Sequence, residues 1–420
     1  MMSNSQIKNT LPEDVVEAVL ATKNYWKQSI GDVSGLMDRI IAHLEMEIDT
    51  IEAELKAGMN PWPEVDYKSI ETNSVSLEVL SRIKKRGCLV VRQHFSEEMA
   101  TQWDQDLVSY IEDNDFDNQY RGPGDDFFST LSASRPEIFP IYWSKPQMEA
   151  NQSKRMQQVQ VFLNGFWKAE SAGKVWFDPK VNCIYPDRVR RRPPGTTSNG
   201  LGPHTDSGAL ERWLLPAYQK VFRHLLNGDF DLYDPWDAAY RPEVNEYESG
   251  TTKCSAFRTF QGWTALSDIK QDQGVLFTVP VPSAMAYLLI RPLLDDVPEE
   301  SLCGVSPRKV LPIDKKWHSL LLRAKALIPD LQAGDSVWWH CDMIHGVDPV
   351  ENQQGWGNVM YIPATPSCEK NRRYARQCAE YFKLGRSPDD FPEEHYEADW
   401  QGRFQWDDLN AIGKAAFNSD

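Results

Sequence analysis

Two histidines and one aspartate, far apart in the chain, have residue types and spacing that suit a divalent metal ion. His204 and Asp206 form a His-x-Asp pair, and His345 lies near the end of the run Gly-Asp-Ser-Val-Trp-Trp-His-Cys-Asp-Met-Ile-His-Gly at 334–346. On an extended segment, side-chain alternation places both members of such a pair on one face. Two imidazoles and one carboxylate can occupy one face of a metal ion and leave the other open, as non-haem Fe(II) sites do. We therefore expect His204, Asp206 and His345 to be catalytic metal ligands.

Neighbouring residues offer competing interpretations. A His-x-Asp pair alone is weak evidence, because His204 could be a hydrogen-bonded loop histidine; its glycine-rich surroundings and the distal run favour the metal. His340 lies in an aromatic run, where a buried histidine that supports a ligand is the better expectation. Asp335 follows a glycine and suits a turn. Cys341 is expected to be a buried thiol rather than a ligand.

A basic cluster precedes the His-x-Asp pair. Arg188, Arg190 and Arg192 alternate with other residues and would share one face of an extended segment. Guanidinium groups bind carboxylates and phosphates in a bidentate manner, so these arginines could capture an anion near the metal. They could equally be solvated and paired with the many acidic residues of the chain.

Length, charge and cysteine content restrict the class of protein. The chain has 420 residues, a formal net charge of −16 and a sequence pI near 5.0, which disfavours nucleic acid and anionic membranes as partners. Seven scattered cysteines without Cys-x-x-Cys spacing predict reduced thiols rather than disulfides or structural zinc. The start has no apolar run of signal-peptide length. We expect a cytoplasmic protein with a small-molecule substrate, and its oligomeric state is left open.

Hydrophobic periodicity divides the chain into three parts. Apolar residues recur at helical spacing over 11–60, a short strand is expected at Cys88–Val91, and Ser96 is the expected N-cap of the next helix. A helix is also expected over 146–170. Strands are expected at Val181–Tyr185, Thr259–Leu266, Val275–Val281, Met285–Ile290, Ser336–Trp339 and Val359–Ile362.

These elements predict a mainly β fold with α: a double-stranded β-helix (jelly roll, cupin-like) with N-terminal and C-terminal helical layers. The expected domains are an N-terminal helical layer at 1–76, an oxygenase core at 77–366 and a C-terminal helical extension at 367–420. The core carries a partly helical insert at 209–256, which follows the His-x-Asp pair. We expect this insert to border the mouth of the active site.

Four blocks resemble the phytanoyl-hydroxylase-like Fe(II)/2-oxoglutarate-dependent oxygenases, and over its whole length the chain resembles the YbiU-type bacterial proteins of that kind. The blocks are Gly87–Glu98, His204–Asp206, Trp263–Pro280 and Gly334–Gly346. The resemblance implies a dioxygenase that binds Fe(II), 2-oxoglutarate and O2, and couples oxidative decarboxylation of 2-oxoglutarate to hydroxylation of a small molecule.

One feature departs from that family. Its members usually carry an arginine beyond the distal histidine to hold the far carboxylate of 2-oxoglutarate, but residues 346–371 contain none. The first candidate replacement is Arg258, at the entry to a core strand. The second is the cluster Arg188, Arg190 and Arg192, with Gln261 and Asn358 as neutral hydrogen-bonding partners. The missing arginine also leaves open a cupin-like metalloenzyme that does not use 2-oxoglutarate, or a non-catalytic sensor of a small carboxylate.

Overall fold

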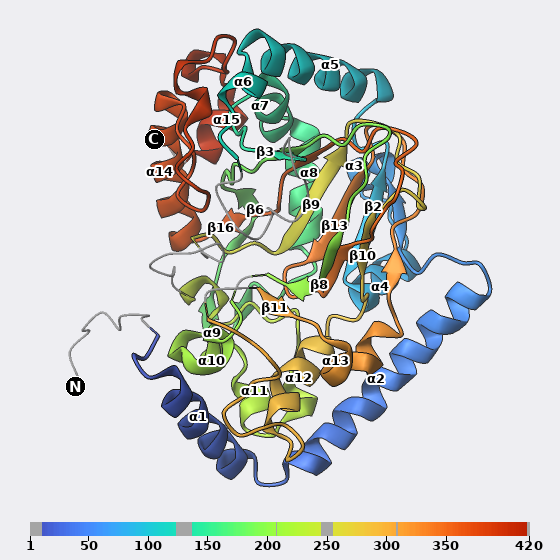
Figure 1. Cartoon of the computed structure of the whole chain (residues 1–420), viewed down its shortest axis with the longest axis vertical. Helices are drawn as coiled ribbons and strands as arrows, with labels where there is room; N and C mark the ends of the chain where they lie inside the picture. The colour runs from blue at the N-terminus through green and yellow to red at the C-terminus, as the bar shows by residue number, and fades with distance from the viewer. Residues whose placement is uncertain (1–10, 123–136, 207, 245–254, 308–309, 418–420) are drawn as a thin grey trace.

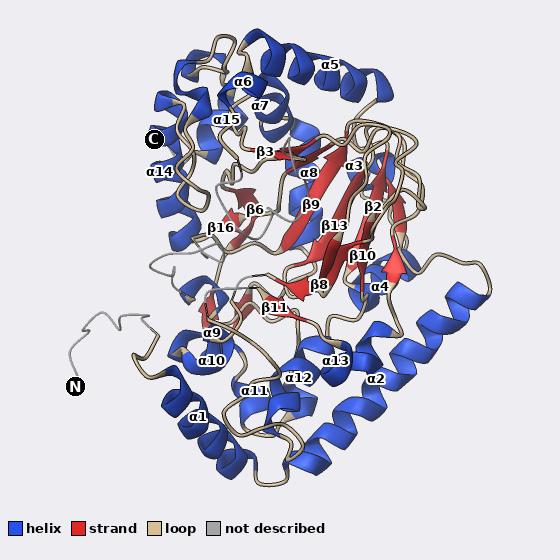
Figure 2. Cartoon of the chain, viewed as in Figure 1, coloured by secondary structure: helices blue, strands red, loops and turns tan. Residues whose placement is uncertain are grey.

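Two β-sheets face each other at the centre of the molecule, and helices flank them (Figures 1 and 2). The computed structural model describes residues 11–122, 137–206, 208–244, 255–307 and 310–417. The first sheet has the order β1-β2-β13-β9-β15-β7-β3, with bounds Glu64–Asp66, Cys88–Arg92, Ser336–His340, Phe260–Ala265, Val359–Tyr361, Val189–Arg190 and Ile138–Phe139. The second has the order β11-β8-β14-β10-β12, with bounds Leu311–Pro312, Leu201–Thr205, His345–Val347, Leu276–Thr278 and Ala326–Leu327.

Alternation along the central strands gives the first sheet two apolar faces. Val337 and Trp339 of β13 share a buried cluster with Trp263 of β9 and with Leu276 of the second sheet, so these side chains lie between the sheets. Trp338 belongs instead to a cluster on the opposite face. Both faces of a strand can be apolar only when both are covered. The first sheet is therefore an inner layer of the molecule.

Helices cover the outer face of the first sheet. Side chains of α5 (Glu97–Asp113) and α8 (Lys154–Asn164) share the outer cluster with Trp338 and Met360. Ser96 caps α5, because its side chain accepts a hydrogen bond from the Met99 amide, as the sequence predicts. The other short elements near the sheets are α3 (Tyr67–Glu71), α4 (Leu77–Arg86), α13 (Lys315–Leu322), and the two-stranded sheets β4 (Glu170–Ser171) with β5 (Lys174–Val175) and β6 (Asp178–Asn182) with β16 (Pro366–Ser367).

The N-terminal helices pack on the insert at one end of the molecule (Figure 1). The expected helical region is two helices, α1 (Val15–Ile30) and α2 (Val33–Lys56), whose apolar faces carry residues such as Trp26 and Ile40. They share one buried cluster with α12 (Ala284–Ile290) and with the helices of the insert, which are α9 (Glu211–Leu214), α10 (Pro216–Val221) and α11 (Arg223–Leu226). The insert is thus held between the N-terminal helices and the sheets.

The C-terminal helices lie at the opposite end (Figure 1). Tyr374 and Phe382 of α14 (Glu369–Leu384) and Phe417, which follows α15 (Ala411–Ala416), share a cluster with Met148 of α7 (Lys145–Asn151). Nearby is α6 (Phe116–Gln119). Among the described residues, no helix is both long and apolar enough to cross a membrane. The three domain boundaries expected from the sequence stay a prediction.

The expectation of a mainly β chain is wrong, because 42% of the structure is helical and 16% is strand. One expected strand, Met285–Ile290, is the helix α12 (Ala284–Ile290), and all its residues are buried. A short apolar run shows no periodicity when every side is buried, so a strand and a buried helix look alike in the sequence.

Three other expected elements differ in their bounds. The helix expected over 146–170 is divided into α7 and α8 by Ser153, which caps α8. The strand expected at Val275–Val281 is shortened to β10, since Pro280 and Pro282 provide no amide hydrogen for a ladder. The strand expected at Val181–Tyr185 is β6, which lies earlier in the chain.

Candidate metal centre

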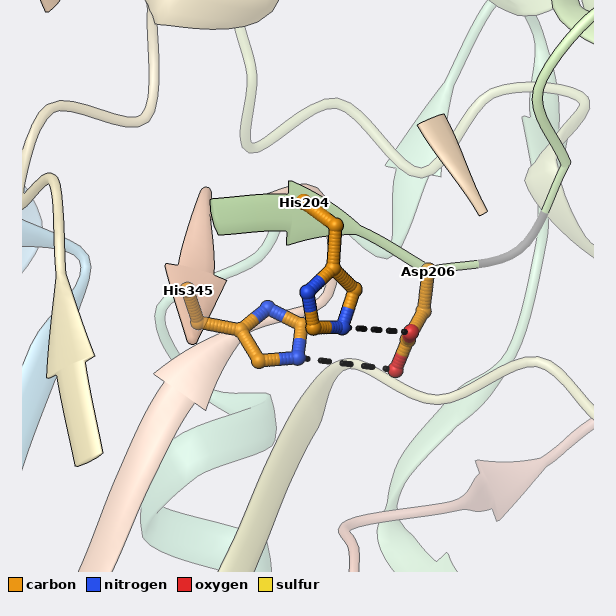
Figure 3. A group of neighbouring side chains, drawn as sticks. All are labelled: His204, Asp206 and His345. Carbon is orange, nitrogen blue, oxygen red and sulfur yellow. Dashed lines mark ion pairs between the residues drawn. The ribbon is translucent and has the colours of Figure 1, made fainter. Parts of the chain in front are cut away.

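The two sequence blocks that predict a metal site meet in the second sheet (Figure 3). His204 on β8 and His345 at the start of β14 are cross-strand partners, and their ring centroids are 4.4 Å apart. Asp206 directly follows β8; its Oδ1 is 3.5 Å from Nε2 of His204 and its Oδ2 is 3.7 Å from Nε2 of His345. One ligand atom from each residue lies within 4.8 Å of the others. The structure therefore brings together all three predicted ligands, whose binding of a metal stays a prediction.

Hydrogen bonds to the backbone fix which nitrogen of each imidazole faces the cluster. Nδ1 of His204 is 2.8 Å from the carbonyl oxygen of Gly202, and Nδ1 of His345 is 3.0 Å from that of Met343. A carbonyl oxygen only accepts, so each Nδ1 must carry a hydrogen and donate it. In the neutral rings this leaves Nε2 with its lone pair, which is the tautomer that binds a metal. The donor set therefore fits a divalent ion.

The surrounding charges keep the aspartate ionised and the distal histidine neutral at neutral pH. Burial raises the pKa of the Asp206 carboxyl, but the nearby His345 and His204 outweigh that effect and hold it well below its usual range. Burial and the neighbouring His204 lower the pKa of His345 to about 4. A divalent cation binds a carboxylate and neutral imidazoles, so these are the ionisation states that it needs.

A glycine allows the strands that carry the histidines to approach closely. Gly346 follows His345 on β14, and a Cβ atom at this position would lie 2.6 Å from the carbonyl oxygen of Leu201 on β8 and 2.5 Å from the ring of Phe277 on β10. Both contacts are too short for any side chain. The His-Gly pair is thus explained by packing between three strands as well as by the histidine itself.

A second group of metal-ligand types, His340, Cys341 and Asp342, ends β13. Nε2 of His340 donates to the carbonyl oxygen of Pro235 at 3.0 Å, and its Nδ1 accepts from the Asp342 amide at 3.1 Å. Burial raises the pKa of the Cys341 thiol to about 12. Asp342 forms buried ion pairs with two arginines. His340 and Asp342 are thus already hydrogen-bonded or ion-paired, and the expectation that His340 and Cys341 are not ligands stays a prediction.

Two buried donors lie next to His345 in the space between the sheets. The ring of Trp339 is 5.3 Å from that of His345, and Gln261 is the cross-strand partner of Trp339. Within the part of the chain that the structure describes, Trp339 Nε1 and Gln261 Nε2 have no hydrogen-bond partner. Buried donors usually have one, so a bound ligand or water is the natural acceptor here. The cofactor-binding role expected of Gln261 stays a prediction.

Arg258 lies beside the cluster, at the end of the sheet where β9 begins. The first residue of β9 pairs with the last residue of β13, from which the chain turns towards His345. The charge of Arg258 contributes to the low pKa values of Asp206 and His345, and its guanidinium carbon is 5.3 Å from the centroid of the Tyr185 ring. The first candidate for the anion-holding arginine is therefore close to the metal ligands rather than deep between the sheets.

Arg190 is the member of the upstream cluster that points between the sheets. It is the cross-strand partner of Val359, which belongs to the apolar cluster there, and cross-strand partners point to the same side. Its Nε donates to the carbonyl oxygen of Gly357 at 3.3 Å. Burial raises the pKa of Tyr361 and the nearby Arg190 opposes that shift. The structure thus places a buried cation and a phenol side by side.

The remaining predicted residues have other contacts. The guanidinium carbon of Arg188 is 4.8 Å from the centroid of the Phe391 ring, in the C-terminal extension. Nη2 of Arg192 donates to two backbone carbonyl oxygens, those of Gln273 and Gly274, at 2.6 and 2.7 Å. Arg192 therefore links its segment to the residues before β10, while its Nε and Nη1 have no hydrogen-bond partner among the described residues.

Asn358 faces away from the metal cluster. Its Nδ2 donates to Oδ1 of Asp104, on helix α5, at 3.0 Å. It precedes the inward-facing Val359, and successive residues of a strand point to opposite faces. Its position gives no support to a role in cofactor binding.

Sequence reasoning missed Arg212, the first arginine of the insert. It is buried and contacts the backbone of Asp206 and the carboxylate of Asp342. A lone arginine in a mixed segment gives no periodic or motif signal, so only the folded chain shows this contact. The insert thus touches the metal-ligand segment, as expected of a region that borders the site.

Comparisons with known proteins establish the family of the chain. An Escherichia coli K12 protein named uncharacterized protein YbiU is 56% identical over 420 residues and covers all of both chains. A solved Salmonella typhimurium LT2 protein, described as a "putative oxidoreductase", is 56% identical with a TM-score of 0.94 over 97% of this chain and 98% of that one. The Candida albicans protein GIG2 (GlcNAc Inducible Gene 2, DUF1479) is 26% identical with a TM-score of 0.80 over 97% and 90%. Residues 15–419 match the Gig2-like family, and the chain belongs to this family.

Proposed function

We propose that the chain is an Fe(II)-dependent oxygenase that couples oxidative decarboxylation of 2-oxoglutarate to hydroxylation of a small molecule. The observation that carries the proposal is the cluster of His204, Asp206 and His345, whose two Nε2 atoms and carboxylate converge. The description of the Salmonella relative as a "putative oxidoreductase" supports the same class of reaction.

The three ligands would hold the iron by one face. When bound, the iron supplies the activation of O2 that 2-oxoglutarate oxidation and substrate hydroxylation require. His204 and His345 would offer Nε2 to the ion, because backbone carbonyl oxygens accept the hydrogens of their Nδ1 atoms. Asp206 contributes one negative charge, which lowers the charge of the ion. The buried Trp339 and Gln261 would exclude water on one side and offer N–H groups to a bound ligand.

The arrangement of strands supports a double-stranded β-helix as the scaffold. β8 and β14, which carry the ligands, are adjacent in the second sheet, and β9 and β13 of the first sheet share a core with β10 and β12 of the second. Two facing sheets with metal ligands at one end are what a jelly roll provides.

Arg190 is the best placed of the candidate arginines to hold the far carboxylate of 2-oxoglutarate. It points between the sheets at the level of Ala265, four residues along β9 from Gln261, or about 13 Å of strand. The length of an arginine side chain, together with that of a five-carbon dicarboxylate, covers this distance. Tyr361 beside it would add a hydroxyl donor. A dicarboxylate in an apolar space needs such a cation, because an unpaired buried carboxylate is strongly disfavoured.

An anaerobic titration with Fe(II) followed by 2-oxoglutarate tests the proposal. We expect one ion per chain and a visible metal-to-ligand charge-transfer band when 2-oxoglutarate is added. Metal binding without this band would contradict 2-oxoglutarate as the co-substrate. Failure of the wild-type protein to bind Fe(II), Co(II) or Mn(II) would contradict the metal site itself.

A second candidate function follows from the absence of arginine between residues 346 and 371. A cupin-like metalloenzyme that does not use 2-oxoglutarate, or a non-catalytic sensor of a small carboxylate, would not need an arginine there. Both would bind the metal, but neither would release succinate and CO2 from 2-oxoglutarate. Measurement of succinate with the iron-loaded protein therefore separates these functions from the oxygenase.

A further inference from the structure

The strand ladder holds two of the three metal ligands but not the third. His204 and His345 pair across β8 and β14, so the backbone of each is fixed by its neighbour. The last residue of β8 in the ladder is Thr205, which pairs with Leu311. Asp206 comes after it. Some other contact must therefore hold the aspartate in place.

Arg212 makes that contact. It lies on α9, its side chain is buried, and its Nη2 donates to the carbonyl oxygen of Asp206 at 2.7 Å. Its Nε donates to the carbonyl oxygen of Gly208 at 2.9 Å. A guanidinium group is planar and rigid, so two such bonds fix both the position and the direction of the segment that leaves β8.

The same guanidinium reaches the segment that precedes the distal histidine. Its Nη1 is 3.1 Å from Oδ1 of Asp342, and both side chains are almost fully buried. Asp342 is tied to its own turn, because its amide donates to Nδ1 of His340. Its Oδ2 is 2.6 Å from Nη1 of Arg241. One arginine thus connects the backbone beside Asp206 to a residue three positions before His345.

We propose that Arg212 and Asp342 are positioning residues: their ion pair joins the two metal-ligand segments and sets the place of the Asp206 carboxylate relative to His204 and His345. The inference rests on the proposed metal site. A buried ion pair contributes little to stability by itself, because desolvation offsets the Coulomb attraction. Its consequence here is geometric, since it connects residues 130 positions apart in the sequence at the point where the ladder stops.

The test compares Asp342→Asn and Arg212→Lys with a matched control, Asp237→Asn. Asp237 pairs with Nη2 of Arg223 at 3.0 Å within the same insert, and among the described residues it contacts none of the three ligands. The metal probe is Co(II), whose visible spectrum reports the coordination geometry. We expect both bridge variants to bind Co(II) at least about tenfold more weakly and with an altered spectrum, while the control binds as the wild type does.

A double variant tests whether the two residues act through one contact. If they do, Arg212→Lys combined with Asp342→Asn weakens Co(II) binding by less than the product of the single effects. Wild-type affinity and spectrum in Asp342→Asn, with retained circular dichroism, would overturn the proposal.

Hydrogen exchange of the metal-free protein separates this inference from the proposed function. Asp342→Asn should speed amide exchange in the peptide that covers residues 204–212, far away in the sequence, whereas Asp237→Asn should leave it unchanged. If the wild-type protein binds no Co(II), the proposed metal site fails, and faster exchange still supports the bridge. Unchanged exchange in both Asp342→Asn and Arg212→Lys would overturn the bridge whatever the metal result.

Discussion

Two groups of histidine, aspartate and cysteine side chains have residue types that could bind a metal ion. They differ in whether their donor atoms are already hydrogen-bonded to the rest of the fold or ion-paired with arginines. In His204, Asp206 and His345, the Nδ1 atoms bond to the backbone while the Nε2 atoms and the carboxylate face one another. In His340 both ring nitrogens are hydrogen-bonded, and both carboxylate oxygens of Asp342 face arginines.

The difference shows that residue type and proximity do not define a metal site. In each group, one ligand atom from each of the three residues lies within 4.8 Å of the others. In the first, the two Nε2 atoms and the carboxylate converge on one another. The second is a buried polar network whose members satisfy each other, and such a network supports the fold. We call these the open cluster and the closed cluster.

The largest expected effect is loss of the metal from the open cluster. His204→Ala or His345→Ala should abolish binding of Fe(II) or Co(II), because two remaining ligands are too few. His340→Ala, in the closed cluster, should keep full metal occupancy and be less stable, since the ring stacks on Trp167 at 4.6 Å. Equilibrium dialysis with metal analysis measures the occupancy. Full occupancy in His345→Ala, combined with loss in His340→Ala, would reverse the assignment of the two clusters.

The free energy of unfolding should fall more when the aspartate of the closed cluster is replaced than when that of the open cluster is replaced. Asp342→Asn breaks a buried carboxylate pairing with two arginines and should lower the free energy of unfolding by about 3 kcal/mol. Asp206→Asn, in the metal-free protein, should lower it by less than Asp342→Asn does, because the carboxylate partners of Asp206 are two histidines rather than two permanently charged arginines. Urea denaturation measures both. Equal losses would mean that the aspartate of the open cluster also holds the fold.

A smaller effect concerns the co-substrate beside the open cluster. Arg190→Gln should leave the metal bound and raise the apparent Kd for 2-oxoglutarate by about tenfold or more, or about 1.4 kcal/mol. Arg258→Gln and Arg188→Gln are the matched comparisons, since Arg258 lies beside the metal ligands and Arg188 contacts Phe391 of the C-terminal extension. The charge-transfer band reports the affinity. A larger loss in Arg258→Gln than in Arg190→Gln would return the role to the arginine beside the metal.

The last effect concerns pH and involves one histidine from each cluster. Burial lowers the pKa of both His340 and His345 to about 4, from a usual value of 6.5. The unfolded chain therefore takes up protons in this window while the folded chain does not, so stability is lost as pH falls from 6.5 towards 4. Each histidine contributes a slope of up to about 1.4 kcal/mol per pH unit. Denaturation of the metal-free protein at several pH values should give a shallower slope for His340→Gln than for the wild type; equal slopes would contradict the buried neutral state of His340.

Local patterns predict the elements that depend on neighbours in the sequence. The helical spacing over 11–60 yields α1 and α2, and Ser96 caps α5, because these features need only adjacent residues. The same reasoning fails at α12, where burial on every side removes the periodicity. It also overestimates the share of strand, since helical layers cover both ends of the sheets.

For the site, the sequence by itself determined which residues could bind a metal. A His-x-Asp pair and a distant His-Gly carry that information, because the chemistry of ligands depends on residue type and local spacing. Which arginine faces the space between the sheets was decided only by the tertiary structure, since only Arg190 of the three clustered arginines lies on a strand of the sheet, where alternation sets its direction. The same holds for the ion pair of Arg212 and Asp342. Its partners are 130 residues apart, and their contact exists only once β8 and β14 have paired and the insert has folded against them.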